Sequence, residues 1–284
     1  MAPDDEKRIA SPQNPKVKEW AALLDKKNRD RSGRFLLEGV HLVQEALQSG
    51  AAVEVIAYDE ERGVPAELKP LLARAGDVSG GCDIYAVTAG VLAKCAGTDT
   101  PPPVVAVAAK PPVDRAALLR PGALVVALDG VRDPGNAGTL IRSADAVGAD
   151  AVVLGRGCVD LYNPKTVRST MGSLFHLPVI EADLAELLPE AKRAGARLIG
   201  TSLQAAANCY DADWTGGVWL LLGSESQGLS PEVLALMDEA VLIPMRGKAE
   251  SLNVAMAGTV LLYEAMRQRH YLRRGTGLKQ RHRS

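Results

Sequence analysis

Residues 123–270 alternate short apolar runs with amphipathic stretches, and no other feature of the sequence restricts the possible folds as strongly. The strand-like runs lie at 123–128, 151–154, around Val179, and at 197–200, 218–223 and 240–243. The stretches with helical spacing lie at 136–148, 164–171, 184–194, 231–237 and 252–270. This alternation predicts an α/β fold, in which helices cover both faces of a parallel sheet. Ligands of such sheets bind in the loops at the carboxyl ends of the strands.

The first hundred residues indicate a second, smaller α/β domain. Apolar residues have helical spacing at 17–25, 38–48, 65–75 and 88–95, and strand-like runs lie at 53–58 and 84–87. The charged stretch 26–39 is predicted to be a connection, because its Ser-Gly pair interrupts a helix. Five prolines surround a strand-like run near residues 101–112. We predict an N-terminal domain at 1–100, a proline-rich linker at 101–113, the main domain at 114–272 and a basic tail at 273–284.

Composition favours a soluble, cytoplasmic protein without metal or redox chemistry. The chain starts with acidic residues, and no run approaches the ~18 apolar residues of a membrane-spanning helix. The four cysteines form no Cys-x-x-Cys pair, and no two of the four histidines have metal-binding spacing. We therefore expect reduced structural thiols, no metal ion and no membrane partner.

Basic residues are concentrated at the two ends of the chain. Residues 7–34 hold nine Lys and Arg against three Asp and Glu, and residues 265–284 hold seven against none. The stretch 35–264 holds 17 against 28, a balance of −11. This segregation favours contact with a polyanion through its phosphates. The alternative for the C-terminal segment is a solvated, disordered tail.

The loop after the strand at 123–128 carries the first candidate site. The residues 133–135, Asp-Pro-Gly, predict a turn, and Asn136 is placed to cap the helix that follows. Arg142 lies six residues further on, ~9 Å along the helix, and a long side chain leaning back could reach the same end and grip a phosphate. An ion pair with Asp129 or Asp145 is the structural alternative.

Three further loops follow strands of the predicted sheet. Thr201, Ser202 and Leu203 supply small groups that could face a nucleoside. The loop that begins at Gly223 contains Ser226, but the G-x-S-x-G pattern of a nucleophile elbow is absent, which disfavours a hydrolase. Neither G-x-G-x-x-G nor G-x-x-x-x-G-K-[ST] occurs, so the usual dinucleotide and phosphate loops are also missing. The last loop opens the final helix with the sequence AESLNVAMAG.

Three motifs together resemble a known enzyme family. DPGNAGTLIRSADAVGAD, LLGSESQGLS and LIPMRGKAESLNVAMAGTVLLYEAMRQR, in this order and spacing, are similar to the motifs of the SpoU/TrmH-type RNA ribose 2′-O-methyltransferases of the SPOUT superfamily. Residues 11–100 resemble the small α/β RNA-binding domain that precedes the catalytic domain in many ribosomal-RNA members. The resemblance implies a C-terminal trefoil knot, an exception to the rule that chains are unknotted. It also implies a homodimer that binds S-adenosyl-L-methionine in the knot.

The resemblance assigns site residues by motif. The implied catalytic positions are Asn136, Arg142, Glu225, Ser251 and Asn253. The implied cofactor positions are Thr201, Ser202, Leu203, Gly223, Ser224, Ile243, Met245, Ser251, Leu252 and Val254. The residues expected to contact RNA through the basic segments and beside the site are Lys16, Lys26, Lys27, Arg29, Arg31, Arg34, Lys165 and Arg168.

The implied reaction is transfer of a methyl group to a ribose 2′-hydroxyl of RNA, most readily ribosomal RNA of the 23S type. Family proposals let the arginine at position 142 activate the hydroxyl, but an arginine stays protonated in proteins. The alternative is that Arg142 binds the adjacent phosphate and stabilises alkoxide charge, with Glu225 orienting its guanidinium. A transfer-RNA methyltransferase and a non-catalytic RNA-binding protein that retains the fold are the competing functions.

Overall fold

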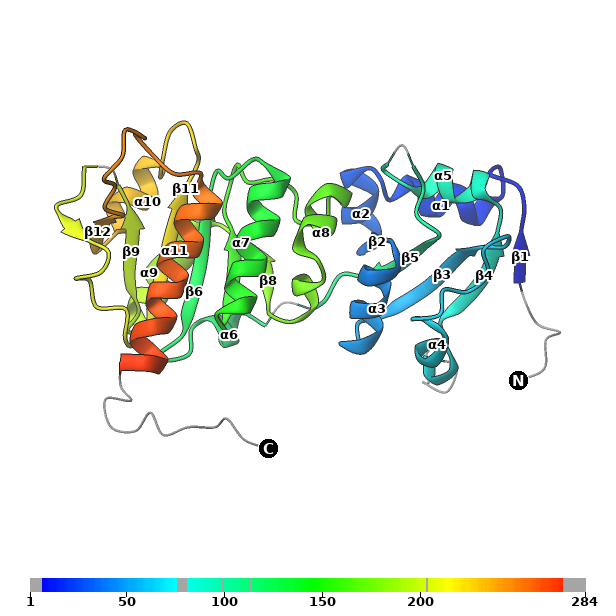
Figure 1. The fold of residues 1–284 in the computed structure, drawn as a ribbon, viewed down its shortest axis with the longest axis horizontal. Helices are drawn as coiled ribbons and strands as arrows, with labels where there is room; N and C mark the ends of the chain where they lie inside the picture. The colour runs from blue at the N-terminus through cyan, green and yellow to red at the C-terminus, as the bar shows by residue number, and fades with distance from the viewer. Residues whose placement is uncertain (1–6, 76–80, 99, 113, 203, 273–284) are drawn as a thin grey trace. The chain divides into compact units, whose positions relative to one another are not determined.

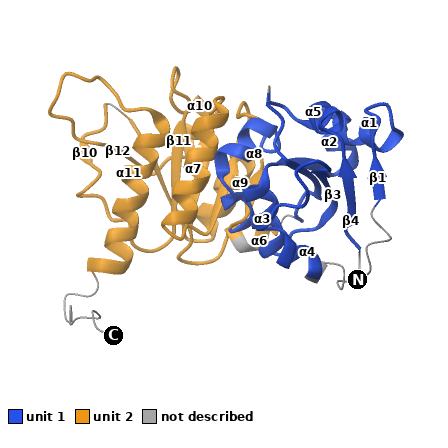
Figure 2. Cartoon of the chain, turned by 45° about the vertical axis from the view of Figure 1, so that its right-hand side comes forward, with its two compact units in different colours: residues 1–113, 160–176 blue, residues 114–159, 177–284 orange. Residues whose placement is uncertain are grey.

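The computed structural model describes residues 7–75, 81–98, 100–112, 114–202 and 204–272. The chain forms two compact units, coloured separately in Figure 2. Unit 1 comprises Met1–Val113 and Asp160–His176, and unit 2 comprises Asp114–Val159 and Leu177–Ser284. Leu203 and the predicted basic tail at 273–284 lie outside the described residues.

Unit 2 is built on a seven-stranded sheet with the order β10-β12-β9-β11-β6-β7-β8. The strands are β6 (Leu124–Asp129), β7 (Ala151–Leu154), β8 (Val179–Glu181), β9 (Arg197–Thr201), β10 (Ala207–Asn208), β11 (Val218–Gly223) and β12 (Glu239–Leu242). Every pair of neighbouring strands in this sheet is parallel, which confirms the predicted parallel α/β fold. The two-residue strand β10 was not predicted, because it is too short to give an apolar pattern.

Helices cover both faces of this sheet (Figure 1). They are α6 (Arg115–Leu118), α7 (Pro134–Ala146), α9 (Leu184–Arg193), α10 (Pro231–Leu236) and α11 (Val254–Met266), which continues as a π-helical turn at Arg267–Tyr271. A core of buried side chains joins α9 and α10 to one face, and includes Trp219 of β11 and Leu187 of α9. On the other face α7 and α11 lie side by side. Burying such large apolar side chains contributes roughly 1.5–3 kcal/mol each relative to exposure.

The order of the strands reverses next to β6. From β6 the chain moves outward through β7 to β8, and then returns to place β11 on the other side of β6. Gly223 and Asp129 end these two neighbouring strands in register. Ligands of open α/β sheets bind where the strand order reverses, so the loops after β6 and β11 frame the expected site.

Unit 1 contains a five-stranded mixed sheet with the order β1-β4-β3-β5-β2. Its strands are β1 (Lys7–Ile9), β2 (Arg34–Glu38), β3 (Val53–Asp59), β4 (Asp83–Val87) and β5 (Val104–Ala109). Its helices are α1 (Pro15–Ala22), α2 (Lys26–Ser32), α3 (Val40–Gln48), α4 (Lys69–Ala75), α5 (Ala89–Cys95) and α8 (Pro164–Thr170), with a 3-10 turn at Ser173–Phe175. The first three strands of that order are mutually parallel, whereas β5 runs antiparallel to both of its neighbours.

Three details of unit 1 correct the expectations from sequence. The stretch 26–39 is not a plain connection, because α2 begins at the cap Asp25 and β2 then buries the side chains of Phe35 and Leu37 completely. The run expected in the linker at 101–113 is β5, which pairs with β2 and β3 in the middle of the sheet. Residues 104–109 therefore belong to the core of unit 1.

The third correction concerns Asp160–His176, which belongs to unit 1 although it was predicted as part of the main domain. Glu38 of β2 is buried and accepts hydrogen bonds from Arg168 (2.6 Å) and from the Gly97 amide (3.1 Å). Arg29 of α2 donates to Asp160, and the His176 ring lies 3.0 Å from the Glu45 carboxylate. Removing one partner of a buried ion pair costs several kcal/mol, so these contacts fix the segment to unit 1.

No helix within the described ranges is both long and apolar enough to cross a bilayer.

Candidate active site

The candidate site lies in unit 2, at the carboxyl ends of β6 and β11. The helix α7 begins there at Pro134, and Asp133 caps it by accepting a hydrogen bond from the Asn136 amide (2.8 Å). The expectation that Asn136 is the cap is therefore wrong, because Asp133 occupies that position. The Asn136 side chain is left available for other contacts.

A chain of hydrogen bonds joins one residue from each of the three sequence motifs. Asn253 donates from its side-chain amide to the Asn136 side-chain oxygen (3.0 Å), and Asn136 donates in turn to the Glu225 carboxylate. These residues are 117 and 89 positions apart in the sequence. The structure thus brings together three of the five predicted catalytic residues.

The orientation of Asn253 is fixed at both ends of its side chain. Its oxygen caps α11 by accepting from the amides of Ala255 (2.9 Å) and Met256 (3.3 Å), while its amide donates to Asn136. Asn253 is therefore the cap of the last helix. Ser251 is exposed two residues before the cap.

Arg142 and Glu225 do not form the pair that was expected. Glu225 receives its hydrogen bond from Asn136, whereas Arg142 is exposed and makes no hydrogen bond or ion pair with any residue that the structure describes. The predicted ion pair between Arg142 and Asp129 is not formed either. The Asp129 carboxylate instead accepts a hydrogen bond from the Ser230 amide (2.6 Å). The guanidinium is thus available to a ligand.

The loop after β11 is a tight turn closed by its own backbone. Ser224 and Gly228 exchange two backbone hydrogen bonds of 3.0 and 2.9 Å, and the Ser224 hydroxyl accepts from the Gln227 amide (3.1 Å). A Cβ atom on Gly223 would lie 2.1 Å from the Gly228 carbonyl carbon, so only glycine fits there. Asp129 holds the far end of the loop through Ser230. The sequence suggested Asp129 only as an ion-pair partner of Arg142 and not for this role, although an acidic residue that ends an apolar strand is a usable signal.

The other predicted cofactor residues that the structure describes lie at the same edge of the sheet. Thr201 ends β9, and the Ser202 amide donates to the carbonyl of Val241 in β12 (3.1 Å). Met245 and Leu252 are 37% and 42% exposed, which is unusual for large apolar side chains. Apolar side chains beside backbone groups at strand ends are suited to an adenine ring, so the residues present fit S-adenosylmethionine.

The close packing of α7 on α11 sets the distance between Asn136 and Asn253. The Ser143 and Thr259 hydroxyls are 2.7 Å apart across the two helices. Gly258 lets the helices approach, because a Cβ atom there would lie 2.3 Å from a methyl carbon of Leu140 and 2.7 Å from one of Leu222.

We expect Gly258→Val to lower the free energy of unfolding by about 1–3 kcal/mol, since it overpacks a filled contact. Urea unfolding followed by circular dichroism measures the change. Gly247→Val is the matched control, because a Cβ atom at Gly247 would meet nothing within 4 Å. Equal stability of the two variants would show that α7 and α11 are not held at this distance.

Cysteine chemistry is not available to the site. The Cys158 thiol donates to the Leu128 carbonyl (3.2 Å) at the end of β6, and burial raises its pKa to about 11. Such a thiol is protonated at neutral pH and is a poor nucleophile. Within the described part of the chain, no three His, Cys, Asp or Glu side chains are grouped as metal ligands.

Seven of the eight basic residues predicted to contact RNA divide into three groups. Lys27 and Lys165 are exposed, and the structure gives their side chains no carboxylate partner within the described ranges. Exposed or half-buried side chains with polar or acidic neighbours are Lys16, Lys26, Arg31 and Arg34. Arg168 is half-buried against Glu38.

Arg29 is a correction. Only 2% of it is exposed, and its guanidinium donates to the Leu23 carbonyl (2.6 Å) and to Asp160. It was predicted from charge alone, but its partner Asp160 lies in a distant segment. Arg29 is a structural residue of unit 1 and does not present its charge to RNA.

Comparisons with known proteins identify the family. The family model described as SpoU rRNA Methylase matches residues 123–263, and the MRM3-like substrate binding domain matches residues 14–106. The 23S rRNA (guanosine(2553)-2′-O)-methyltransferase RlmP of Bacillus subtilis is 38% identical over 257 residues, which are 90% of this chain and 98% of that protein. The chain belongs to the SpoU rRNA methylase family. The resemblance stated from the motifs is confirmed.

Two further matches agree with this assignment. The 23S rRNA (uridine(2479)-2′-O)-methyltransferase of Streptomyces viridochromogenes is 37% identical, over 93% of each chain. The crystal structure of the SpoU methyltransferase AviRb from Streptomyces viridochromogenes, in complex with the cofactor AdoMet, superposes with a TM-score of 0.81 at 37% identity. It covers 90% of this chain and 98% of that one. The α/β fold of this SpoU family member is therefore that of a solved methyltransferase.

Proposed function

We propose that this SpoU family member transfers a methyl group from S-adenosylmethionine to a ribose 2′-hydroxyl of ribosomal RNA of the 23S type. The observation that carries the proposal is the hydrogen-bonded set Asn253, Asn136 and Glu225, which joins all three motifs where the strand order reverses. A protein that only binds RNA has no need of such a set, nor of an exposed arginine without a described partner on the helix that carries Asn136. The relatives are named as ribosomal-RNA methyltransferases, which supports the substrate class.

The cofactor would be held by the loops after β9, β11 and β12 and by the start of α11. When bound, S-adenosylmethionine supplies an electrophilic methyl group on a sulfonium sulfur. Leu252 and Met245 would cover the adenine, and the turn at Gly223 and Ser224 would present backbone groups to it. Excluding water and fixing both reactants accounts for much of the rate of such a transfer.

The polar side chains of the site position the RNA and stabilise charge. Asn136 and Asn253, held rigid by their mutual hydrogen bond, fix the ribose, and Glu225 fixes Asn136. Arg142 is protonated, so it binds the neighbouring phosphate and stabilises the alkoxide that forms as the 2′-hydroxyl loses its proton. Ser251 completes the ribose contacts from the loop before α11.

Exposed basic residues of unit 1 supply backbone affinity for RNA. We expect the logarithm of the RNA association constant to fall linearly with the logarithm of salt concentration, because phosphate contacts release counterions. Lys165→Gln should reduce that slope by about 1, whereas Arg29→Gln should lower the melting temperature. Fluorescence anisotropy with labelled ribosomal-RNA fragments measures the slope. RNA binding that does not depend on salt concentration would contradict the proposed contact between these basic residues and the RNA phosphates.

The protein acts as a homodimer in the cytoplasm, with its C-terminal segment threaded into a trefoil knot. The dimer is supported by α11, where Met256 and Tyr263 are 54% and 47% exposed although the helix is apolar. Such a surface is typical of a helix that packs against a second subunit. Sedimentation equilibrium tests the dimer, and a monomer at all concentrations would contradict it.

Methyl transfer is tested on RNA from cells that lack the gene. Purified protein and tritiated S-adenosylmethionine should label the large ribosomal RNA, and primer extension at low nucleotide concentration should then stop at one new position. Label in transfer RNA would favour the transfer-RNA alternative. Failure to bind S-adenosylmethionine would favour the non-catalytic alternative. The methylated nucleotide is left to this experiment, because similar relatives act on guanosine in one case and uridine in the other.

A further inference from the structure

Unit 1 contains a hollow on one face of its sheet, over β4. Arg8 of β1 and Tyr58 of β3 are both in register with Ala86 of β4, which lies between them. Side chains in register across neighbouring strands project on the same face. Because Ala86 carries only a methyl group, the space between the two long side chains stays open. Glu60, Gly63 and Val64 complete the wall of a cavity of about 380 Å³.

The packing of unit 1 explains why this face is open here. The neighbours of these residues along the strands, Ile9 and Val87, project to the opposite face and are buried in a core with α1 and α5. The helix α3 packs against β5 and β2, which form the end of the sheet opposite β1. The hollow therefore lies over the strands farthest from α3, where the sheet ends at β1.

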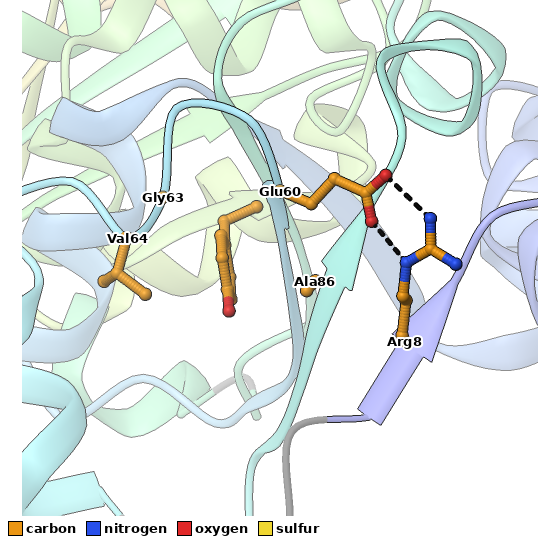
Figure 3. Close-up of a pocket in the computed structure, with 6 residues that line it drawn as sticks. Arg8, Glu60, Gly63, Val64 and Ala86 are labelled. Atoms are coloured by element: carbon orange, nitrogen blue, oxygen red, sulfur yellow. Dashed lines mark hydrogen bonds and ion pairs between the residues drawn. The ribbon is translucent and has the colours of Figure 1, made fainter. Parts of the chain in front are cut away.

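Two charged groups line the hollow, as Figure 3 shows. Arg8 donates from Nε and Nη2 to the two carboxylate oxygens of Glu60, at 2.6 and 3.0 Å. The Arg8 side chain is 62% exposed and that of Glu60 is 24% exposed. An exposed ion pair contributes little to stability, so a ligand can replace these contacts at low cost. The Arg8 hydrogen bond lowers the pKa of Glu60, and the group is a carboxylate at neutral pH with or without that bond.

We propose that this hollow binds an unpaired guanine base of the RNA substrate. The volume lies at the lower end of the roughly 300–1,000 Å³ found for small-ligand pockets, which suits a single base. Apolar surface from Val64 and Ala86 faces the flat ring, and sequence-specific RNA recognition targets unpaired bases in this way. The proposal rests on the proposed function, since it takes RNA as the substrate.

The order of the polar groups selects guanine among the bases. Guanine presents two neighbouring donors, N1–H and the N2 amine, followed by two acceptors, O6 and N7. Glu60 only accepts hydrogen bonds, so it matches the two donors N1–H and N2. Arg8 only donates them, so it matches the two acceptors O6 and N7. Adenine offers a single donor beside an acceptor on the same edge. A phosphate is disfavoured, because the Glu60 carboxylate would repel it.

The site is distinct from the candidate active site and from what the family match covers. None of the candidate catalytic residues belongs to unit 1, which contains the hollow. The substrate-binding family model begins at residue 14, which includes Glu60 but excludes Arg8. Arg8, the hydrogen-bond donor of the pair proposed to recognise guanine, therefore comes from β1, a strand outside that match.

The test uses the full-length protein and free nucleotides as probes. Isothermal titration should show saturable binding of 5′-GMP, with 5′-IMP about tenfold weaker because it lacks the N2 amine that would bond to a charged acceptor. Binding of 5′-AMP should be undetectable at the same concentrations. Glu60→Gln should weaken 5′-GMP binding by about tenfold or more. Glu61→Gln, which alters the adjacent exposed carboxylate outside the hollow, should leave it unchanged.

Three results would overturn the proposal. These are no saturable binding of 5′-GMP, equal binding of 5′-GMP and 5′-AMP, or unchanged 5′-GMP binding by a Glu60→Gln protein with wild-type circular dichroism. Arg8→Lys, on the edge strand, gives a second variant should Glu60→Gln fail to fold, and it should also weaken 5′-GMP binding.

A methylation assay separates this proposal from the proposed function. Glu60→Gln should raise KM for ribosomal RNA by about tenfold and leave kcat unchanged, because it removes binding shared by ground and transition states. Guanine-selective binding by a protein that methylates no RNA would contradict the proposed function and support the guanine site. Methyl transfer with a wild-type KM in Glu60→Gln would support the proposed function and contradict the guanine site.

Discussion

Arg142→Ala is expected to lower kcat for methyl transfer by about 10²- to 10³-fold, the range found when one charge-stabilising donor is removed from an active site. The reason is that Arg142 is exposed on α7, the helix that carries Asn136, and makes no bond to any described residue. Its loss removes no packing, so folding should be preserved. Single-turnover methylation with tritiated S-adenosylmethionine measures the chemical step.

The control is Arg193→Ala, which removes an exposed arginine from α9, where no site residue lies. It should keep wild-type turnover. Affinities for S-adenosylmethionine and for RNA, measured separately, should change by less than about tenfold in Arg142→Ala, which places the loss in the chemical step. Wild-type turnover by an Arg142→Ala enzyme that still binds RNA would remove Arg142 from the mechanism altogether.

Arg142→Lys separates the two roles considered for this residue. Lysine keeps the positive charge but lacks the planar fork that grips a phosphate through two parallel hydrogen bonds. Partial activity would show that charge near the alkoxide suffices, whereas a loss equal to that of alanine would show that bidentate positioning dominates.

The sequence predicted the sheet of unit 2 well because each of its main strands is a continuous apolar run. The loops after these strands also marked where a site could lie, but the candidate site residues themselves were assigned through the family motifs. The sequence did not predict their contacts. Asn136 and Glu225 meet only because β11 inserts beside β6, and the order of strands in a sheet is not visible in periodicity.

The errors in unit 1 have a related physical cause. The helix α2 buries a single side chain, that of Arg29, so it carries no apolar periodicity and was taken for a connection. Strand β2 is short and buried on both faces, so its residues do not alternate. Arg29 was assigned to RNA because charge predicts exposure, but a carboxylate 131 positions away pairs with it.

Gly223→Ala is expected to weaken S-adenosylmethionine binding by about 100-fold. The added methyl would lie within 2.4 Å of three backbone atoms of Gly228 and Leu229, and backbone cannot move aside as the end of a side chain can. Overpacking of this kind costs about 1–3 kcal/mol or more, and each 1.4 kcal/mol corresponds to tenfold in affinity. Because the displaced segment is the proposed cofactor turn, much of that cost should appear in binding.

The matched control is Ser226→Ala, an exposed residue of the same turn, for which the structure records no hydrogen bond among the described residues. It should bind the cofactor as the wild type does. Isothermal titration gives the affinities for S-adenosylmethionine. The melting temperature shows how far Gly223→Ala destabilises the folded protein. A Gly223→Ala protein with wild-type affinity would mean that the turn after β11 is not part of the cofactor site. The segments assigned to S-adenosylmethionine would then be the loops after β9 and β12 and the start of α11.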